Sequence, residues 1–172
     1  EMIYSYFGRI RQIMIILALQ VLVFDYIHLW GYATPLLGVM VVVYSPLSDN
    51  RVTNLVMSFM AGIVMDMFTN SPGVAAASMT LASFVQHPLL EMMVPKDSDE
   101  NMLPSWHTMG MSSYSAYVAI MLAVYHVAYF VLEVFSFINP VDMIISIVSS
   151  YFLSFILAMS FELFRFAKKG NV

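Results

Sequence analysis

Six apolar stretches divide the chain, and short polar segments separate them. A helix needs about 20 mostly apolar residues to cross the hydrocarbon core of a bilayer, and each stretch approaches or reaches that length. The pattern therefore predicts six membrane-spanning helices, over residues 12–29, 33–48, 52–69, 74–94, 113–137 and 140–165. Residues 95–112 are the one substantial polar segment, and we expect them to form a loop.

Two of these stretches carry features that affect the prediction. The first follows Arg9 and Arg11, as the apolar core of a signal peptide would, but no small-residue cleavage site follows it, so we expect an uncleaved span. The fourth is the least hydrophobic and contains His87, Pro88 and Glu91. We expect it to lie inside the bundle and to kink near Pro88, because proline removes a helical hydrogen bond.

Composition indicates a membrane protein and excludes a water-soluble one. The 172 residues are 60% hydrophobic and 10% charged, whereas a soluble globular domain has roughly 45–50% apolar and about 25% charged residues. Six spans use nearly the whole chain, so we expect residues 1–172 to form a single membrane domain. The sequence contains no cysteine, which excludes a disulfide framework and a cysteine metal site.

Basic residues predict the orientation in the membrane. With six spans and a cytoplasmic N-terminus, all seven Lys and Arg residues fall on the cytoplasmic side, where such residues are enriched. Both termini and the loop at residues 95–112 are then cytoplasmic. If the short second stretch did not cross, the two basic ends of the chain would face opposite sides, so this charge pattern also supports the count of six.

Acidic residues follow a different pattern, because Asp25, Asp66, Glu133 and Asp142 fall toward the predicted outer ends of spans. Two interpretations stay open: these side chains lie at the wet membrane interface, or they bind a basic segment of a partner. Asp66 lies within an apolar run, where a carboxylate costs about 2.5–3.5 kcal/mol on insertion scales. We therefore expect Asp66 to face protein rather than lipid.

The depth of Asp66 in its span suggests its partners. The candidates are His28, His126 and the backbone amides of the turn at residues 70–73, which would receive the carboxylate as a helix terminus receives an anion. Gly62 precedes Asp66 by one helical turn and follows Ser58 by another, so small residues line one face of the third span.

A second face of small residues runs along the last span, through Ser146, Ser150, Ser154 and Ala158. Small residues let two helix backbones approach closely in a membrane. Either face can pack against a helix of this chain or against a helix of a partner, and the sequence favours neither interpretation.

No pattern in the chain predicts catalysis, a metal site or a cofactor. The four His residues are scattered, without the spacing of paired metal ligands on a helix. Neither a G-x-S-x-G motif nor a P-loop is present, and Ser105 and His107 are too close in sequence to predict a catalytic pair. We therefore expect a protein that is not an enzyme, needs no cofactor and binds no nucleic acid.

The segment FMAGIVMDMFTNSPGVAAAS at residues 59–78 resembles the signature of MreD, the family of rod shape-determining membrane proteins. The fragments LQVLV at 19–23, HLWGYATP at 28–35 and FVLEVFSF at 130–137 are similar to its Bacteroidetes branch, so the resemblance covers nearly the whole chain. One position departs from that branch, because His87 stands where the resemblance implies an arginine.

This resemblance implies a non-enzymatic subunit of the bacterial cell-elongation (rod) complex, surrounded by lipid in the inner membrane. Proteins of the family bind MreC and, through it, the RodA-type glycosyltransferase, a class B penicillin-binding protein and MreB, and they support peptidoglycan synthesis and cell shape. The implied fold is a six-helix bundle like the substrate-binding components of energy-coupling-factor transporters. The residues expected to bind a partner, or to shape the surface that does, are Gly62, Asp66, Pro72, Gly73 and Glu133.

The likeness to those transporters supplies an alternative function, a vitamin-binding transport subunit. Two observations weigh against it. The transporter components dock through an Ala-x3-Ala pattern on the first span, whereas Leu22 here follows Ala18 by four residues. A pocket for a polar vitamin also needs several convergent polar groups, and the predicted outer loops here are very short. A general intramembrane scaffold unrelated to the cell wall is a third alternative, which only the family resemblance separates from the first.

Overall fold

The computed structural model describes residues 2–22, 36–46, 50–69, 72–94, 103–133 and 140–169. Over these residues the protein is all-helical, as the sequence predicts, and they contain no β-strand. The helices are α1 (Met2–Leu22), α2 (Met40–Val43), α3 (Arg51–Thr69), α4 (Val74–Met93), α5 (Trp106–Met109), α6 (Met111–Glu133) and α7 (Pro140–Lys169). The predicted span residues 23–29, 33–35, 47–48 and 134–137, and loop residues 95–102, lie outside this description.

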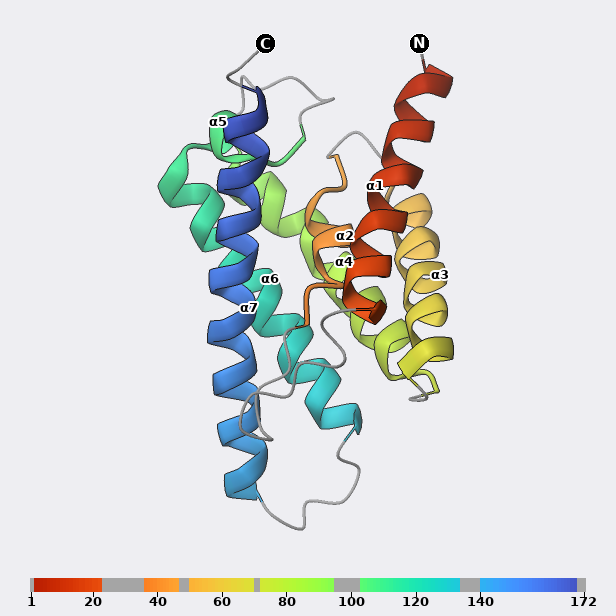
Figure 1. Ribbon diagram of the computed structural model, residues 1–172, viewed down its shortest axis with the longest axis vertical. Helices are drawn as coiled ribbons and strands as arrows, with labels where there is room; N and C mark the ends of the chain where they lie inside the picture. Colours follow the sequence, from red (N-terminus) through yellow and green to blue (C-terminus); the bar gives the residue numbers. More distant parts are fainter. Residues whose placement is uncertain are drawn as a thin grey trace.

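The long helices form a bundle around the short segment that contains α2 (Figure 1). α3 and α4 are antiparallel neighbours, α4 also packs against α6, and α6 packs against α7. α1 begins and α7 ends at the same end of the bundle. We name this the inner end, and the opposite one the outer end, after the predicted orientation.

Three helices in the described part of the chain are long and apolar enough to cross a membrane. They are α3, α6 and residues Pro140–Phe164 of α7. Helices of this length and composition make the chain a helical membrane protein. The count of six spans stays a prediction.

α7 shows how the bilayer acts as the solvent of this fold. Its exposed face is apolar and includes Ile144, Phe152 and Phe164, whereas its buried face includes Ser154 and Glu162. A helix of a water-soluble protein has the reverse arrangement. Lipid tails are as apolar as leucine, so the apolar face can stay outside while polar groups find partners within the bundle.

The second apolar stretch is not a long helix over its described residues. Residues 36–46 are all buried, and only the single turn Met40–Val43 is α-helical, although the sequence predicts a span over residues 33–48. Local sequence permits the short helix without requiring it: Gly38 and the four β-branched valines at residues 39–43 lower the helix propensity, and Pro46 cannot continue a helix. Non-helical backbone at membrane depth is tolerated where protein surrounds it, as here.

Side chains of helices distant in the sequence accept hydrogen bonds from the backbone N–H groups at the outer end of this segment. The Leu36 N–H donates to Ser154 Oγ of α7 at 2.9 Å, and the Leu37 N–H donates to Gln20 Oε1 of α1 at 2.6 Å. Ser154 also lies 3.1 Å from His126 Nε2 of α6. Because an unpaired buried amide is costly, these contacts replace the hydrogen bonds that a continuous helix would supply.

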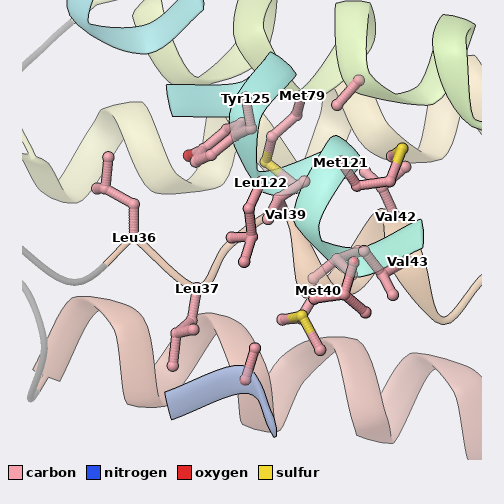
Figure 2. Close-up of a cluster of buried hydrophobic side chains, with 14 of the residues drawn as sticks. Leu36, Leu37, Val39, Met40, Val42, Val43, Met79, Met121, Leu122 and Tyr125 are labelled. Atoms are coloured by element: carbon pink, nitrogen blue, oxygen red, sulfur yellow. The ribbon is translucent and has the colours of Figure 1, made fainter. Parts of the chain in front are cut away.

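The same segment supplies the centre of the apolar core. Val39, Val42 and Val43 are fully buried, and Figure 2 shows them packed with Met79 of α4 and Met121 of α6. The segment thereby joins helices that are far apart in the sequence. It fixes the positions of α4 and α6, and hence of the α3–α4 pair.

The polar loop differs in detail from the sequence prediction, whereas the fourth span agrees with it in its bounds. Within the predicted loop 95–112, the one-turn helix α5 begins at Trp106, and the side chains of its N-cap residue Ser105 and of Thr108 form a capping box. α6 begins at Met111, two residues before the predicted span. α4 runs through Pro88 and ends at Met93, one residue short of the predicted span at residues 74–94, and the kink near Pro88 stays a prediction.

Candidate functional site: the α3–α4 hairpin and its groove

The carboxylate of Asp66 joins the outer end of α3 to the start of α4. Its Oδ2 accepts hydrogen bonds from the N–H groups of Gly73 at 3.1 Å and Ala76 at 3.0 Å, and its Oδ1 accepts one from Ala75 at 2.8 Å. The side chain is 8% exposed. The first N–H groups of a helix have no partner within the helix and carry its positive dipole, so a carboxylate stabilises them strongly.

This geometry confirms part of the prediction for Asp66. The side chain faces protein, and backbone amides receive it, although two of the three belong to the first turn of α4 rather than to the turn at residues 70–73. His126 instead contacts the Leu122 carbonyl oxygen and Ser154. His28 lies outside the described residues.

Gly62 lets the backbones of α3 and α4 touch. A Cβ atom on Gly62 would lie 2.7 Å from the Ala76 nitrogen and 2.9 Å from the Ala75 oxygen, and closer still to the Ala76 Cα. These are backbone atoms, which cannot rotate away as a side chain can. Gly62 therefore holds α4 at the distance at which Asp66, one turn later, reaches the amides of Ala75 and Ala76.

The turn before α4 depends on Gly73 for a different reason. Gly73 has a φ of 87°, and no atom lies within 4 Å of the position that its Cβ would take. This left-handed conformation is costly for other residues and free for glycine. Gly73 thus starts α4 at the point where its amides meet Asp66, and the exposed Pro72 precedes it.

A groove of about 840 Å³ runs along the exposed side of this hairpin, between α3 and α4. Its α3 wall consists of Leu55, Phe59, Ile63, Asp66 and Met67, and its turn and α4 wall consist of Pro72, Gly73, Ala76, Ala77, Thr80, Leu81 and Phe84. The side-chain polar groups of this lining already have partners, because Asp66 binds the three amides and the Thr80 hydroxyl donates to the Ala76 carbonyl at 2.7 Å. The groove is therefore suited to an apolar occupant.

Charged residues lie at the inner end of the hairpin. Arg51 Nη2 is 3.7 Å from Glu91 Oε2, and His87 Nε2 is 3.3 Å from Glu91 Oε1. The His87 position, where the resemblance implies an arginine, thus still contacts an acid. Both Arg51 and Glu91 are more than half exposed, at 58% and 54%.

The other acidic residues of the predicted outer rim have separate positions. Glu133 is exposed at the end of α6, and Asp142 is exposed in the first turn of α7. Asp66 is buried in the hairpin instead of facing water, and Asp25 lies outside the described residues. The structure therefore brings Gly62, Asp66 and Gly73 together with Pro72, and leaves Glu133 apart from them.

Both faces of small residues pack inside the chain. Ser58, Gly62 and Asp66 are buried against α4, and Ser150, Ser154 and Ala158 are buried on α7. The sequence left open whether these faces pack against helices of this chain or of a partner, and the structure shows that these residues pack within the chain. An external partner must use another surface.

Sequence analysis missed a buried polar layer near the inner end. Glu162 is 1% exposed and accepts a hydrogen bond from the Tyr44 hydroxyl at 2.9 Å. Gln86 donates to the Ser45 carbonyl at 3.0 Å and accepts from the Asn54 amide at 2.8 Å. One signal was available, because Glu162 follows Ala158 by one helical turn and so extends the small-residue face of α7.

The fold and the site define a helical membrane protein whose α3–α4 hairpin carries an open apolar groove on its surface. No protein-family model, no curated protein and no solved structure matches the chain. Its function is therefore argued from the groove and from the residues that build it.

Proposed function

We propose that this protein is an MreD-like, non-enzymatic subunit of the bacterial rod complex, which binds MreC and supports peptidoglycan synthesis and cell shape. In this proposal the chain crosses the inner membrane six times, with both termini in the cytoplasm. MreC links it to the RodA-type glycosyltransferase, the class B penicillin-binding protein and MreB. The support is the resemblance of residues 59–78, together with the place of those residues in the structure.

One observation carries the proposal. Eight of the twelve residues that line the groove lie within residues 59–78: Phe59, Ile63, Asp66, Met67, Pro72, Gly73, Ala76 and Ala77. The segment with the family-like sequence thus builds most of the open apolar groove on the hairpin. Within this segment Gly62, Asp66 and Ser78 are buried, whereas Phe59, Met67 and Ala77 are exposed.

The hairpin can act as a rigid platform for a transmembrane helix of MreC. Gly62 and Asp66 fix α4 against α3 by backbone contact and by three hydrogen bonds, so the two walls of the groove keep their spacing. An apolar helix that packs between the walls gains van der Waals contact without leaving a polar group unpaired. The exposed Glu133 offers an acidic contact for a basic segment of the partner at the outer membrane surface.

A groove-filling variant tests this proposal in cells. Ala77→Trp places a large ring in the groove, and Ala116→Trp places the same ring at an exposed position of α6, outside the groove. We expect the tagged wild-type protein and Ala116→Trp to recover MreC from native membranes in mild detergent, and Ala77→Trp to recover much less. Equal recovery by the two variants would exclude the groove as the docking surface.

The same purification also tests the transport alternative. Recovery of ATPase subunits with a bound vitamin, in place of MreC, would replace the rod-complex function with transport. The groove itself disfavours that outcome, because its polar side chains, Asp66 and Thr80, are engaged with backbone atoms of the hairpin.

A further inference from the structure

We infer that the α3–α4 groove of the partner-free subunit holds an acyl chain of an anionic phospholipid, whose phosphate lies on Arg51. The inference rests on the proposed function in one respect, because it takes this groove as the partner's docking surface and identifies what the partner must displace. Lipid binding itself does not depend on the identity of the partner.

The cation lies at the inner end of the apolar groove. Arg51 begins α3 one helical turn before Leu55 and contacts Glu91 of α4, so it lies at the inner end of the two helices that form the groove. From Arg51 to Ile63 the α3 wall is 12 residues long, or about 18 Å at 1.5 Å per residue. One leaflet of a bilayer contributes about 15 Å of hydrocarbon, half of the usual 30 Å core. The stretch from Arg51 to Ile63 therefore comes close to the depth of a single leaflet, with the cation at its surface.

The chemistry of the groove fits a hydrocarbon chain. Phe59, Leu81 and Phe84 provide apolar walls, and Ala76 and Ala77 provide a floor of small residues. The Asp66 carboxylate is turned toward the amides of α4, and the Thr80 hydroxyl toward its own helix. An occupant needs no donor or acceptor here, and a bare groove in a membrane is filled by lipid unless protein covers it.

Arg51 can bind a phosphate in addition to its acidic neighbour. Its contact with Glu91, at 3.7 Å, is longer than the 2.7–2.9 Å or so of a strong charge-assisted hydrogen bond. A guanidinium has five N–H donors in a fork that matches phosphate oxygens, and this one is exposed. Glu91 is the local competitor, since its carboxylate would face the same phosphate. The two residues should therefore act on lipid binding in opposite directions.

Lipid occupancy would regulate docking by competition. An acyl chain and a partner helix cannot occupy the same volume between Phe59 and Phe84. Partner binding is then accompanied by lipid release, and a membrane richer in anionic lipid weakens it.

Native mass spectrometry of the purified subunit, without partner, tests the inference. The protein is titrated with phosphatidylglycerol and, separately, with phosphatidylcholine in mild detergent. We expect wild type to retain one phosphatidylglycerol in preference to phosphatidylcholine, and Arg51→Gln to bind phosphatidylglycerol about fivefold more weakly, as for the loss of one cation at a membrane surface. Glu91→Gln should raise the preference for phosphatidylglycerol, and Ala77→Trp should abolish the retained lipid, whereas Ala116→Trp keeps it.

Two results would overturn the inference. One is equal lipid retention by Ala77→Trp and Ala116→Trp, and the other is equal phosphatidylglycerol affinity of wild type and Arg51→Gln. Failure of the proposed function gives a different result, namely the expected lipid pattern without recovery of MreC. If MreC is recovered by wild type and not by Ala77→Trp, but no lipid is retained, the proposed function is supported and lipid binding in the groove is refuted.

Discussion

Replacing Asp66 by asparagine should destabilise the protein through a single orphaned amide. Asparagine keeps one carbonyl oxygen, which can take the place of Oδ2 and accept from Gly73 and Ala76. The asparagine NH₂ group then takes the place of Oδ1, which accepts from the Ala75 N–H at 2.8 Å in the wild-type protein. Two donors face each other there, and Ala75 is fully buried. A buried donor without an acceptor costs about 1–3 kcal/mol. Asp66→Leu removes both acceptor oxygens, leaves three amides without that acceptor, and should cost more.

Thermal unfolding in one mild detergent measures this cost. For a chain of this size, about 2–4 °C of melting temperature corresponds to 1 kcal/mol, so a cost of about 2 kcal/mol lowers the melting temperature by about 4–8 °C. Asp142→Asn is the matched control, because it removes the charge of an exposed acid in the first turn of α7, where a helix-dipole contribution is about 0.3–1 kcal/mol. If Asp66→Asn melts no lower than Asp142→Asn, the carboxylate does not fasten α4, and the account of the hairpin is wrong.

Three further predictions use the same melting assay. Gly62→Ala puts a methyl group against the backbone of α4 and should cost about 1–3 kcal/mol or more, so a melting temperature equal to that of wild type would contradict the close contact. Tyr44→Phe removes a donor from the buried Glu162 and should cost about 1–3 kcal/mol, and a double-mutant cycle with Glu162→Gln should show coupling between the two positions. Ser154→Ala removes the acceptor of a buried amide and should lower the melting temperature, whereas Ser149→Ala, whose hydroxyl bonds to its own helix, should not.

Sequence reasoning located Asp66 and its environment from general physics. A carboxylate inside an apolar run must face protein, and the nearest unpaired donors are those of a following helix start. The turn signal at residues 70–73 placed that helix start within reach. The choice among candidate partners needed the structure, because it depends on how α3, α4 and α6 are positioned around one another.

The second apolar stretch could not be described from its own residues. Its length and hydropathy are those of a span, but whether its backbone is helical depends on side chains such as Gln20 and Ser154, which supply acceptors from α1 and α7. Ser154 is 118 residues away from Leu36 in the sequence. One sequence does not reveal such pairs, and for the same reason the Tyr44–Glu162 contact was missed.

Gly62, Asp66 and Gly73 together hold α4 against α3, and the contact made by each residue depends on the other two. Burial of apolar surface gives little drive for two helices to associate when lipid is the alternative neighbour, so close backbone packing and hydrogen bonds must hold them. Gly62 supplies the close approach, Gly73 starts α4 at the right point, and Asp66 then meets amides that have no other helical acceptor. Because these polar contacts are turned inward, the outward surface of the hairpin is free to be wholly apolar. A hairpin built in this way is rigid without using its groove for stability, which leaves the groove available to an occupant.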